Sequence, residues 1–108
     1  FIVAGTGSAD AGNVEENRLE LTEGEMQGIC PLWWLRECFD TMPDTVPKVI
    51  GRLSGRDHGD IPFSADGYVT AWFMYWLQGD EDAGKAFFGV DVEVKANENW
   101  QDVTINYK

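Results

Sequence analysis

The residue with the clearest capacity for chemistry is His58, the only histidine in the chain, which lies within Gly55-Arg56-Asp57-His58-Gly59-Asp60. Imidazole is the usual general base for a serine nucleophile. Such a base needs a carboxylate on its other ring nitrogen, which sets the tautomer and the orientation of the ring. Asp10 is the best candidate for this carboxylate, and Glu15 and Glu16 are the alternatives.

Two β-type runs are placed to bring these residues together. Residues 1–5 form a short apolar run that ends in a glycine-rich turn, and residues 47–53 form a second run directly before the His58 loop. About 40 residues with a helical pattern separate them, which is typical of a right-handed crossover between parallel strands. The carboxyl ends of parallel strands share one sheet edge, where α/β proteins build their sites. Asp10 and His58 are therefore expected to meet at that edge.

Helical periodicity marks the segments that would cover the sheet. Apolar residues recur at three- and four-residue steps over 24–42, and Pro31 predicts that this helix begins near that proline. A second helix is predicted over 65–78, with Ser64 or Asp66 as its N-cap. It is apolar nearly all round, which predicts burial on several sides.

The C-terminal part of the chain has weaker patterns. Residues 80–88 predict one more short helix. Residues 91–94 and 103–105 alternate weakly, as short strands or extended segments would. The expected fold class is α/β, a parallel strand pair with covering helices. The first strand is expected to have an unpaired edge, which proteins normally cover.

The composition excludes several classes of partner. The hydrophobic fraction of 44% favours a folded chain, and the net charge is −11. A nucleic-acid partner is not expected, because a phosphate backbone requires a basic surface. An anionic membrane surface is disfavoured for the same reason. No stretch reaches the roughly 20 apolar residues of a membrane span, and the sequence does not indicate a compartment.

The two cysteines, Cys30 and Cys38, are eight residues apart. On one helix this separation is about 12 Å along the axis, which is too far for a disulfide. The spacing also matches no zinc-ligand motif. We therefore expect buried free thiols, with a link to something outside the segment as the alternative, and neither a metal nor another cofactor.

Three other patterns are weaker. Gly5-x-Gly7 after a strand is part of a dinucleotide-binding fingerprint, but Asp10 stands where the third glycine should be. The acidic stretch 15–25 lacks the residue order of a calcium loop and is better explained as a solvated face. Aromatic residues could form a ligand platform or an acyl pocket, but a packed core is the expected role. These residues are Trp33, Trp34, Trp72, Phe73, Tyr75 and Trp76.

Two stretches carry a resemblance to a known family: the His58 loop, and Ala65-Asp66-Gly67-Tyr68-Val69-Thr70-Ala71-Trp72-Phe73-Met74-Tyr75-Trp76-Leu77-Gln78-Gly79-Asp80. Together with the strand and turn before Asp10, they resemble the end of bacterial α/β-hydrolases of the chlorophyllase, dienelactone hydrolase and cutinase-like polyester-hydrolase type. The resemblance spans roughly residues 1–89. It implies serine-dependent hydrolysis of a small-molecule carboxylic ester, with His58 as the base and Asp10 as its orienting acid.

The nucleophile of such a triad should precede both residues in the chain. The three serines are Ser8, Ser54 and Ser64, and none lies in a G-x-S-x-G turn. We therefore expect residues 1–108 to be the C-terminal portion of an α/β-hydrolase domain. Alone it should be inactive, and it should depend on the missing N-terminal part of the same fold or self-associate. The alternative is a small acidic binding or interaction module without chemistry, with its strand edges capped by its own tail.

Overall fold

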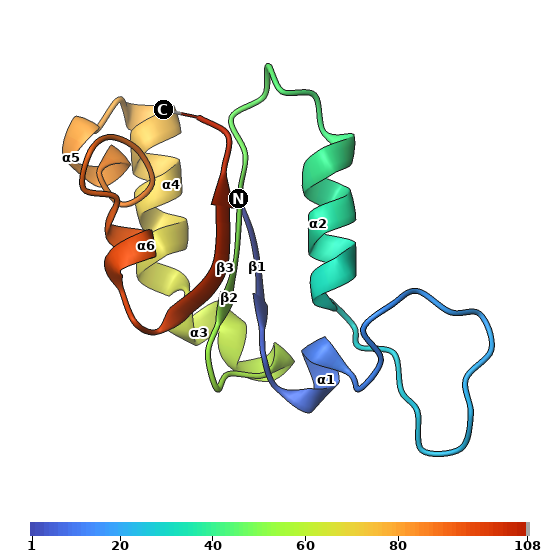
Figure 1. Ribbon diagram of the computed structural model, residues 1–108. Coiled ribbons are helices and arrows are strands. Elements are labelled where there is room, and N and C mark those ends of the chain that lie inside the picture. Colours follow the sequence, from blue (N-terminus) through green and yellow to red (C-terminus); the bar gives the residue numbers. More distant parts are fainter. Residues whose placement is uncertain (108) are drawn as a thin grey trace.

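A three-stranded sheet with the order β1-β2-β3 lies at the centre of the computed structural model, which describes residues 1–107 (Figure 1). β1 (Ile2–Gly5) pairs in parallel with β2 (Val49–Leu53). β3 (Trp100–Ile105) pairs antiparallel with the other edge of β2. The predicted α/β class and the parallel strand pair are confirmed.

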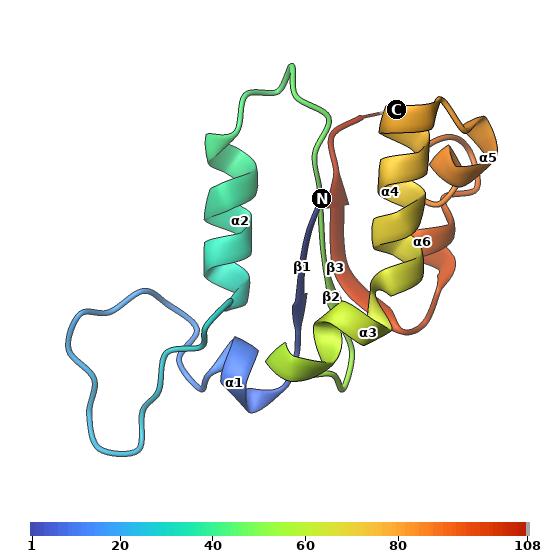
Figure 2. The ribbon, with the colours of Figure 1, turned by 180° about the vertical axis from the view of Figure 1, so that it is seen from behind.

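Helices cover both faces of this sheet. α2 (Leu32–Thr41) lies on one face, and α4 (Asp66–Gln78) lies on the other, as the two opposite views show (Figures 1 and 2). The remaining helical segments are single turns: α1 (Ser8–Ala11), the 3₁₀ turn η1 (His58–Asp60), α3 (Ile61–Ser64), α5 (Glu81–Gly84) and α6 (Glu93–Ala96).

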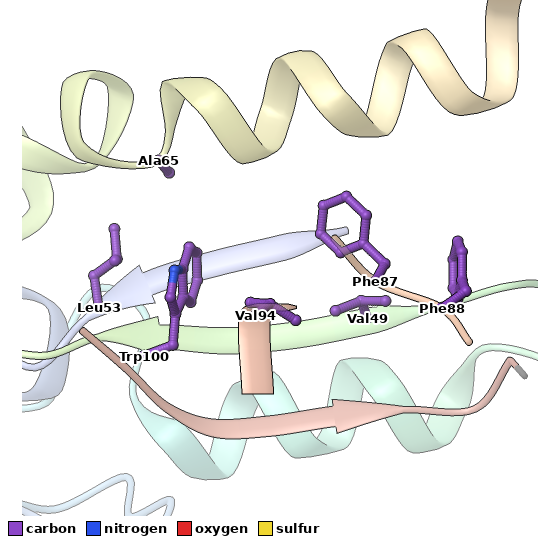
Figure 3. Packing of buried hydrophobic residues seen from close by; sticks show 7 residues of the cluster. All are labelled: Val49, Leu53, Ala65, Phe87, Phe88, Val94 and Trp100. Carbon is purple, nitrogen blue, oxygen red and sulfur yellow. The ribbon is translucent and has the colours of Figure 1, made fainter. Parts of the chain in front are cut away.

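The alternation of side chains along β2 divides the core into two parts. Val49 and Leu53 point to the α4 side and join the larger cluster, whose buried members are drawn in Figure 3. Ile50 points to the α2 side, where it packs with Ala4 and Leu35. β2 is therefore buried on both faces, as is usual for a strand in a parallel pair with helices on both sides.

Most element predictions from the sequence are confirmed. Both strands and both long helices are present, and α2 begins directly after its N-cap Pro31. The predicted N-cap of α4 is wrong. Ala65 holds that position without a side-chain hydrogen bond, because the short helix α3 ends at Ser64 and passes directly into α4.

Two further predictions are wrong. The short strand or extended segment expected over 91–94 is absent, and Glu93–Ala96 instead forms the helical turn α6, which buries Val94 against the main cluster. α4 has no fully buried residue, and several of its apolar side chains are exposed. Only one side of this helix faces the sheet, so its nearly uniform apolar character does not correspond to burial on several sides. Within residues 1–107, no helix has both the length and the apolar character needed to cross a membrane.

A buried lysine ties the end of α2 to the start of β2. The Lys48 side chain is 2% exposed, and its Nζ donates to the carbonyl oxygens of Phe39 and Met42, both at 2.6 Å. It also lies 3.1 Å from a carboxylate oxygen of Asp44. Carbonyls at a helix C-terminus lack partners within the helix and attract cations. Lys48 thereby satisfies the end of α2 and anchors the strand that leads to His58.

Candidate acid–histidine site

The site lies where the two parallel strands end. α1, which carries Asp10, begins three residues after β1 ends at Gly5. η1, which begins with His58, follows β2 after a short turn. Because β1 and β2 are parallel and in register from Ile2 to Gly5, their following loops lie side by side (Figure 1).

The predicted contact between the acid and the histidine is present. His58 Nδ1 lies 2.7 Å from Asp10 Oδ1, a charge-assisted hydrogen-bond distance. The Asp10 side chain is 1% exposed, whereas the His58 side chain is 55% exposed. The carboxylate is thus held inside the protein, and the ring it orients extends toward solvent. The catalytic roles of both residues stay predictions.

The second oxygen of the Asp10 carboxylate also has a partner. Asp10 Oδ2 accepts the backbone N–H of Gly5 at 2.7 Å. A buried carboxylate is costly unless its oxygens receive hydrogen bonds, and here each oxygen receives one. The two bonds fix the plane of the carboxylate and hence the direction in which Oδ1 faces the ring.

Asp57 joins the two loops, a role that the sequence analysis missed. Its carboxylate accepts the backbone N–H groups of Ala9 and Asp10 at 3.0 Å and that of His58 at 2.8 Å. The bond from Ala9, followed by that from His58, holds the pKa of Asp57 below its ordinary value. One carboxylate therefore positions the backbone of the acid and the backbone of the base.

The close approach of the loops requires a residue without a side chain at Gly5. A Cβ at this position would clash with the carbonyl oxygen of Arg56 in the neighbouring loop. The same carbonyl accepts the N–H of Gly7 at 2.8 Å, which closes the contact. The glycine-rich turn after β1 is thus explained by the packing of the two loops.

This geometry contradicts a dinucleotide site at the Gly5-x-Gly7 turn. A pyrophosphate would need the free N–H groups at the start of the following helix. The N–H groups of Ala9 and Asp10 are instead occupied by the Asp57 carboxylate, whose negative charge would repel a phosphate. α1 is also only four residues long.

The alternative acids do not reach the histidine. Glu15 and Glu16 are exposed in the long loop after α1, and Glu16 lies 3.5 Å from the guanidinium of Arg18. Within residues 1–107, Asp10 is the only carboxylate that forms a hydrogen bond with the His58 ring. The preference for Asp10 is therefore supported by the contact itself.

Cys30 is the second residue that the sequence analysis missed. Its Sγ, a carboxylate oxygen of Asp10 and a ring nitrogen of His58 all lie within 4.8 Å of one another. Burial, followed by the charge of Asp10, raises the pKa of the Cys30 thiol. An activated nucleophile would show the opposite shift. Both cysteines are free, as expected, but half-buried rather than buried.

The described serines offer no nucleophile at the ring. Ser54 donates its hydroxyl to Gln101 at 2.7 Å, and Ser8 and Ser64 lie in short helices. Across residues 1–107, no hydrogen bond joins a serine hydroxyl to His58. With Nδ1 facing Asp10, the neutral ring presents Nε2 as an acceptor, so the pair can accept a proton from a nucleophile that comes from elsewhere.

Two aromatic residues line cavities rather than the core. Trp33 borders a cavity of about 480 Å³ beside Ala11 and Gly12, and Trp34 borders a second cavity of about 530 Å³ beside β1. His58 lines neither cavity, so neither belongs to the acid–histidine site.

A scan against protein-family models, a search of curated proteins and a search of solved structures each found no match for this chain.

Proposed function

We propose that this chain carries the acid and the general base of a serine-dependent carboxylic-ester hydrolase of the α/β-hydrolase type. A further segment outside residues 1–108 supplies the serine and the oxyanion donors, which completes the catalytic triad. The observation that carries the proposal is the 2.7 Å contact between His58 Nδ1 and the buried Asp10 carboxylate. It is the arrangement that a base needs if its other nitrogen is to accept a proton.

The position of the pair in the fold supports this proposal. Asp10 and His58 follow two adjacent parallel strands, at the sheet edge where α/β proteins bind their ligands. Within the described residues, β1 pairs with β2 on one side and has no strand on the other. A further parallel strand on that open side would bring its own carboxyl-end loop to the same edge. The serine would then approach the half-exposed ring.

The proposed mechanism follows from the hydrogen bonds. His58 Nε2 takes the proton of the serine hydroxyl as its oxygen attacks the ester carbonyl, and the protonated ring then delivers that proton to the leaving alcohol. Asp10 holds the ring in place and stabilises the imidazolium. Water, activated by the same nitrogen, releases the acid from the acyl-enzyme.

The test is hydrolysis of p-nitrophenyl acetate and butyrate by the protein as its complete gene encodes it, and by residues 1–108 alone. We expect activity in the complete protein and none in residues 1–108 above the imidazole background. His58→Ala should lower kcat by several orders of magnitude, and Asp10→Asn by a factor on the order of 10⁴. Glu15→Gln is the matched control and should keep the full rate.

Two results would overturn the proposal. One is near-normal hydrolysis by either the His58 or the Asp10 variant of the complete protein. The other is enzyme-like turnover by residues 1–108 alone, because no described serine reaches the ring.

A small acidic binding module is the second candidate, and one observation favours it. The C-terminal strand β3 covers the outer edge of β2, as a tail that completes an independent fold would do. This candidate expects residues 1–108 to be a monodisperse monomer that melts cooperatively. The hydrolase proposal expects self-association or poor solubility, because β1 and the apolar side of α4 are uncovered. Sizing chromatography with thermal melting separates the two.

A further inference from the structure

Three different kinds of metal-binding donor converge at the acid–histidine site. A carboxylate oxygen of Asp10, the Sγ of Cys30 and a ring nitrogen of His58 lie within 4.8 Å of one another. Among residues 1–107, no other group of three or more histidine, cysteine, aspartate or glutamate side chains meets this condition. The chain is rich in acidic residues, but this group combines a carboxylate with a thiol and an imidazole, so it is not simply a cluster of surface carboxylates.

The backbone holds Cys30 in this position. The N–H of Cys30 donates to the carbonyl oxygen of Asp10 at 3.1 Å, and the N–H of Ile29 donates to that of Ala9 at 2.8 Å. A Cβ at Gly28 would clash with the carbonyl oxygen of Asp10, so only glycine permits this approach. The backbone of Cys30 is therefore fixed beside that of Asp10 by the fold.

The donor set matches the ligand preference of zinc. Zn²⁺ binds thiolate, imidazole and carboxylate at about 2.0–2.3 Å in tetrahedral geometry, which places neighbouring donors roughly 3.3–3.6 Å apart. The donor atoms here are separated by 2.7 Å for Asp10 and His58 and by at most 4.8 Å for pairs with Cys30. Small side-chain rotations would bring them to that spacing. The His58 ring is half exposed, so it can rotate and an ion can enter.

We propose that Asp10, Cys30 and His58 bind one Zn²⁺ ion, with water in the fourth position. The thiol releases its proton to solvent as the zinc–sulfur bond forms. Nδ1 is the ring nitrogen that faces Asp10, and it coordinates in place of that hydrogen bond. The remaining proton of the neutral ring then resides on Nε2, which can no longer accept a proton from a serine. Zinc and general-base catalysis are therefore mutually exclusive, a consequence that rests on the proposed hydrolase function, whereas the binding itself does not.

Binding is tested on residues 1–108 in the presence of a non-thiol reductant. Isothermal titration with Zn²⁺ gives the stoichiometry and Kd, and absorption with Co²⁺ reports a thiolate-to-metal band when sulfur coordinates. We expect one site with this band. Mg²⁺ and Ca²⁺ should not compete, because they prefer oxygen donors only.

Cys30→Ser and Cys38→Ser form a matched pair, since both remove one free, half-buried thiol. Cys30→Ser should raise the Kd for Zn²⁺ at least about tenfold and abolish the thiolate band, because even the loss of a supporting group commonly costs 10–100-fold. Cys38→Ser should bind as the unmodified chain does. A signal of His58 that shifts on zinc addition, followed by NMR, completes the ligand assignment.

The inference is overturned by any of three results: no saturable zinc binding, equal binding by the two cysteine variants, or a His58 signal that zinc leaves in place. Each of these would leave the hydrolase proposal intact, because that proposal depends on ester hydrolysis by the complete protein. Absence of ester hydrolysis in the zinc-free complete protein, with zinc binding retained, would contradict the hydrolase proposal alone.

Discussion

Replacing Asp10 by asparagine should switch the tautomer of the only histidine. In the unmodified chain the Asp10 carboxylate accepts a hydrogen bond from His58 Nδ1, so the neutral ring carries its proton on that nitrogen. In the Asp10→Asn variant, the N–H of Gly5 still requires an oxygen at the position of Oδ2. The amide NH₂ group is then directed at Nδ1, which must become an acceptor. The proton therefore moves to Nε2.

The size of the effect follows from the hydrogen bond. Hydrogen bonds to charged groups contribute about 1.5–3 kcal/mol. Since the His58 side chain is 55% exposed, the lower end of this range applies. At about 1.4 kcal/mol per tenfold change, the Nδ1–H form should be favoured roughly tenfold in the unmodified chain. In the Asp10→Asn variant, the Nδ1–H form would place the ring N–H against an N–H of the amide. The ratio of the Nδ1–H to the Nε2–H form should therefore reverse by at least a similar factor.

Long-range ¹H–¹⁵N correlation NMR measures the tautomer directly, and a single histidine makes the assignment unambiguous. The spectra are recorded at mildly alkaline pH, where imidazoles are neutral. Glu15→Gln, which neutralises an exposed acid of the neighbouring loop, should leave the ring unchanged. A mainly Nε2–H ring in the unmodified chain, or an unchanged ring in Asp10→Asn, would refute the proposed orientation of the base.

Three further expectations concern stability. Backbone hydrogen bonds, first from Ala9 and then from His58, lower the pKa of Asp57 from 3.8. The contribution of Asp57 to the free energy of unfolding is therefore complete above pH 3.8 and is lost as the pH falls through the lower pKa of the folded state. Asp57→Asn should weaken the loss of stability at acidic pH, measured by urea unfolding as a function of pH. Lys48→Met leaves two helix-end carbonyls unpaired and should lower the free energy of unfolding, measured by chemical denaturation, by about 2–4 kcal/mol. Lys85→Met, at a side chain that is 74% exposed, should leave the free energy of unfolding nearly unchanged. Equal costs for the two lysines would contradict the capping role. Burial, followed by the hydrogen bond to Glu93, raises the pKa of Tyr68 from 10.0 to about 12, so the free energy of unfolding should fall as the pH rises from 10 toward 12. Tyr68→Phe should reduce this fall, measured as the change in Tm between about pH 10 and pH 12. An unchanged dependence of Tm on pH in the variant would contradict the role of Tyr68.

The pairing of Asp10 with His58 could be predicted because it depends on strand direction. Two β-type runs separated by a helix are expected to be parallel, and the ends of parallel strands meet. The start of α2 could also be predicted from the sequence, because Pro31 restricts where a helix can begin. These features depend on local chemistry and on one topological rule.

The residues that were missed depend on contacts between segments that carry no periodic signal. Cys30 reaches the site through backbone hydrogen bonds to α1, and Asp57 acts through N–H groups that any residue would offer. The weak alternation over residues 91–94 predicts a short strand or extended segment, whereas Glu93–Ala96 forms a helical turn that buries Val94 against the main cluster, a contact that the local pattern does not reveal. Spacing in the sequence also could not reveal that Asp10 of α1, Cys30 before α2 and His58 of η1 lie close together.

The long loop after α1 is closed at its base, and this closure has a consequence for how the protein tolerates change. Asn13 donates its backbone N–H to the carbonyl of Met26 at 2.9 Å, and its side chain bonds both Gly24 and Met26. A β-bridge between Gly12 and Gln27 adds to this closure. Doubling the length of a closed flexible loop costs only about 0.6 kcal/mol. Insertions between residues 19 and 21, which lie beyond the contacts of Glu16 and Arg18 with Gln27 and Glu25, are therefore expected to leave in place the acid that precedes the loop and the thiol that follows it.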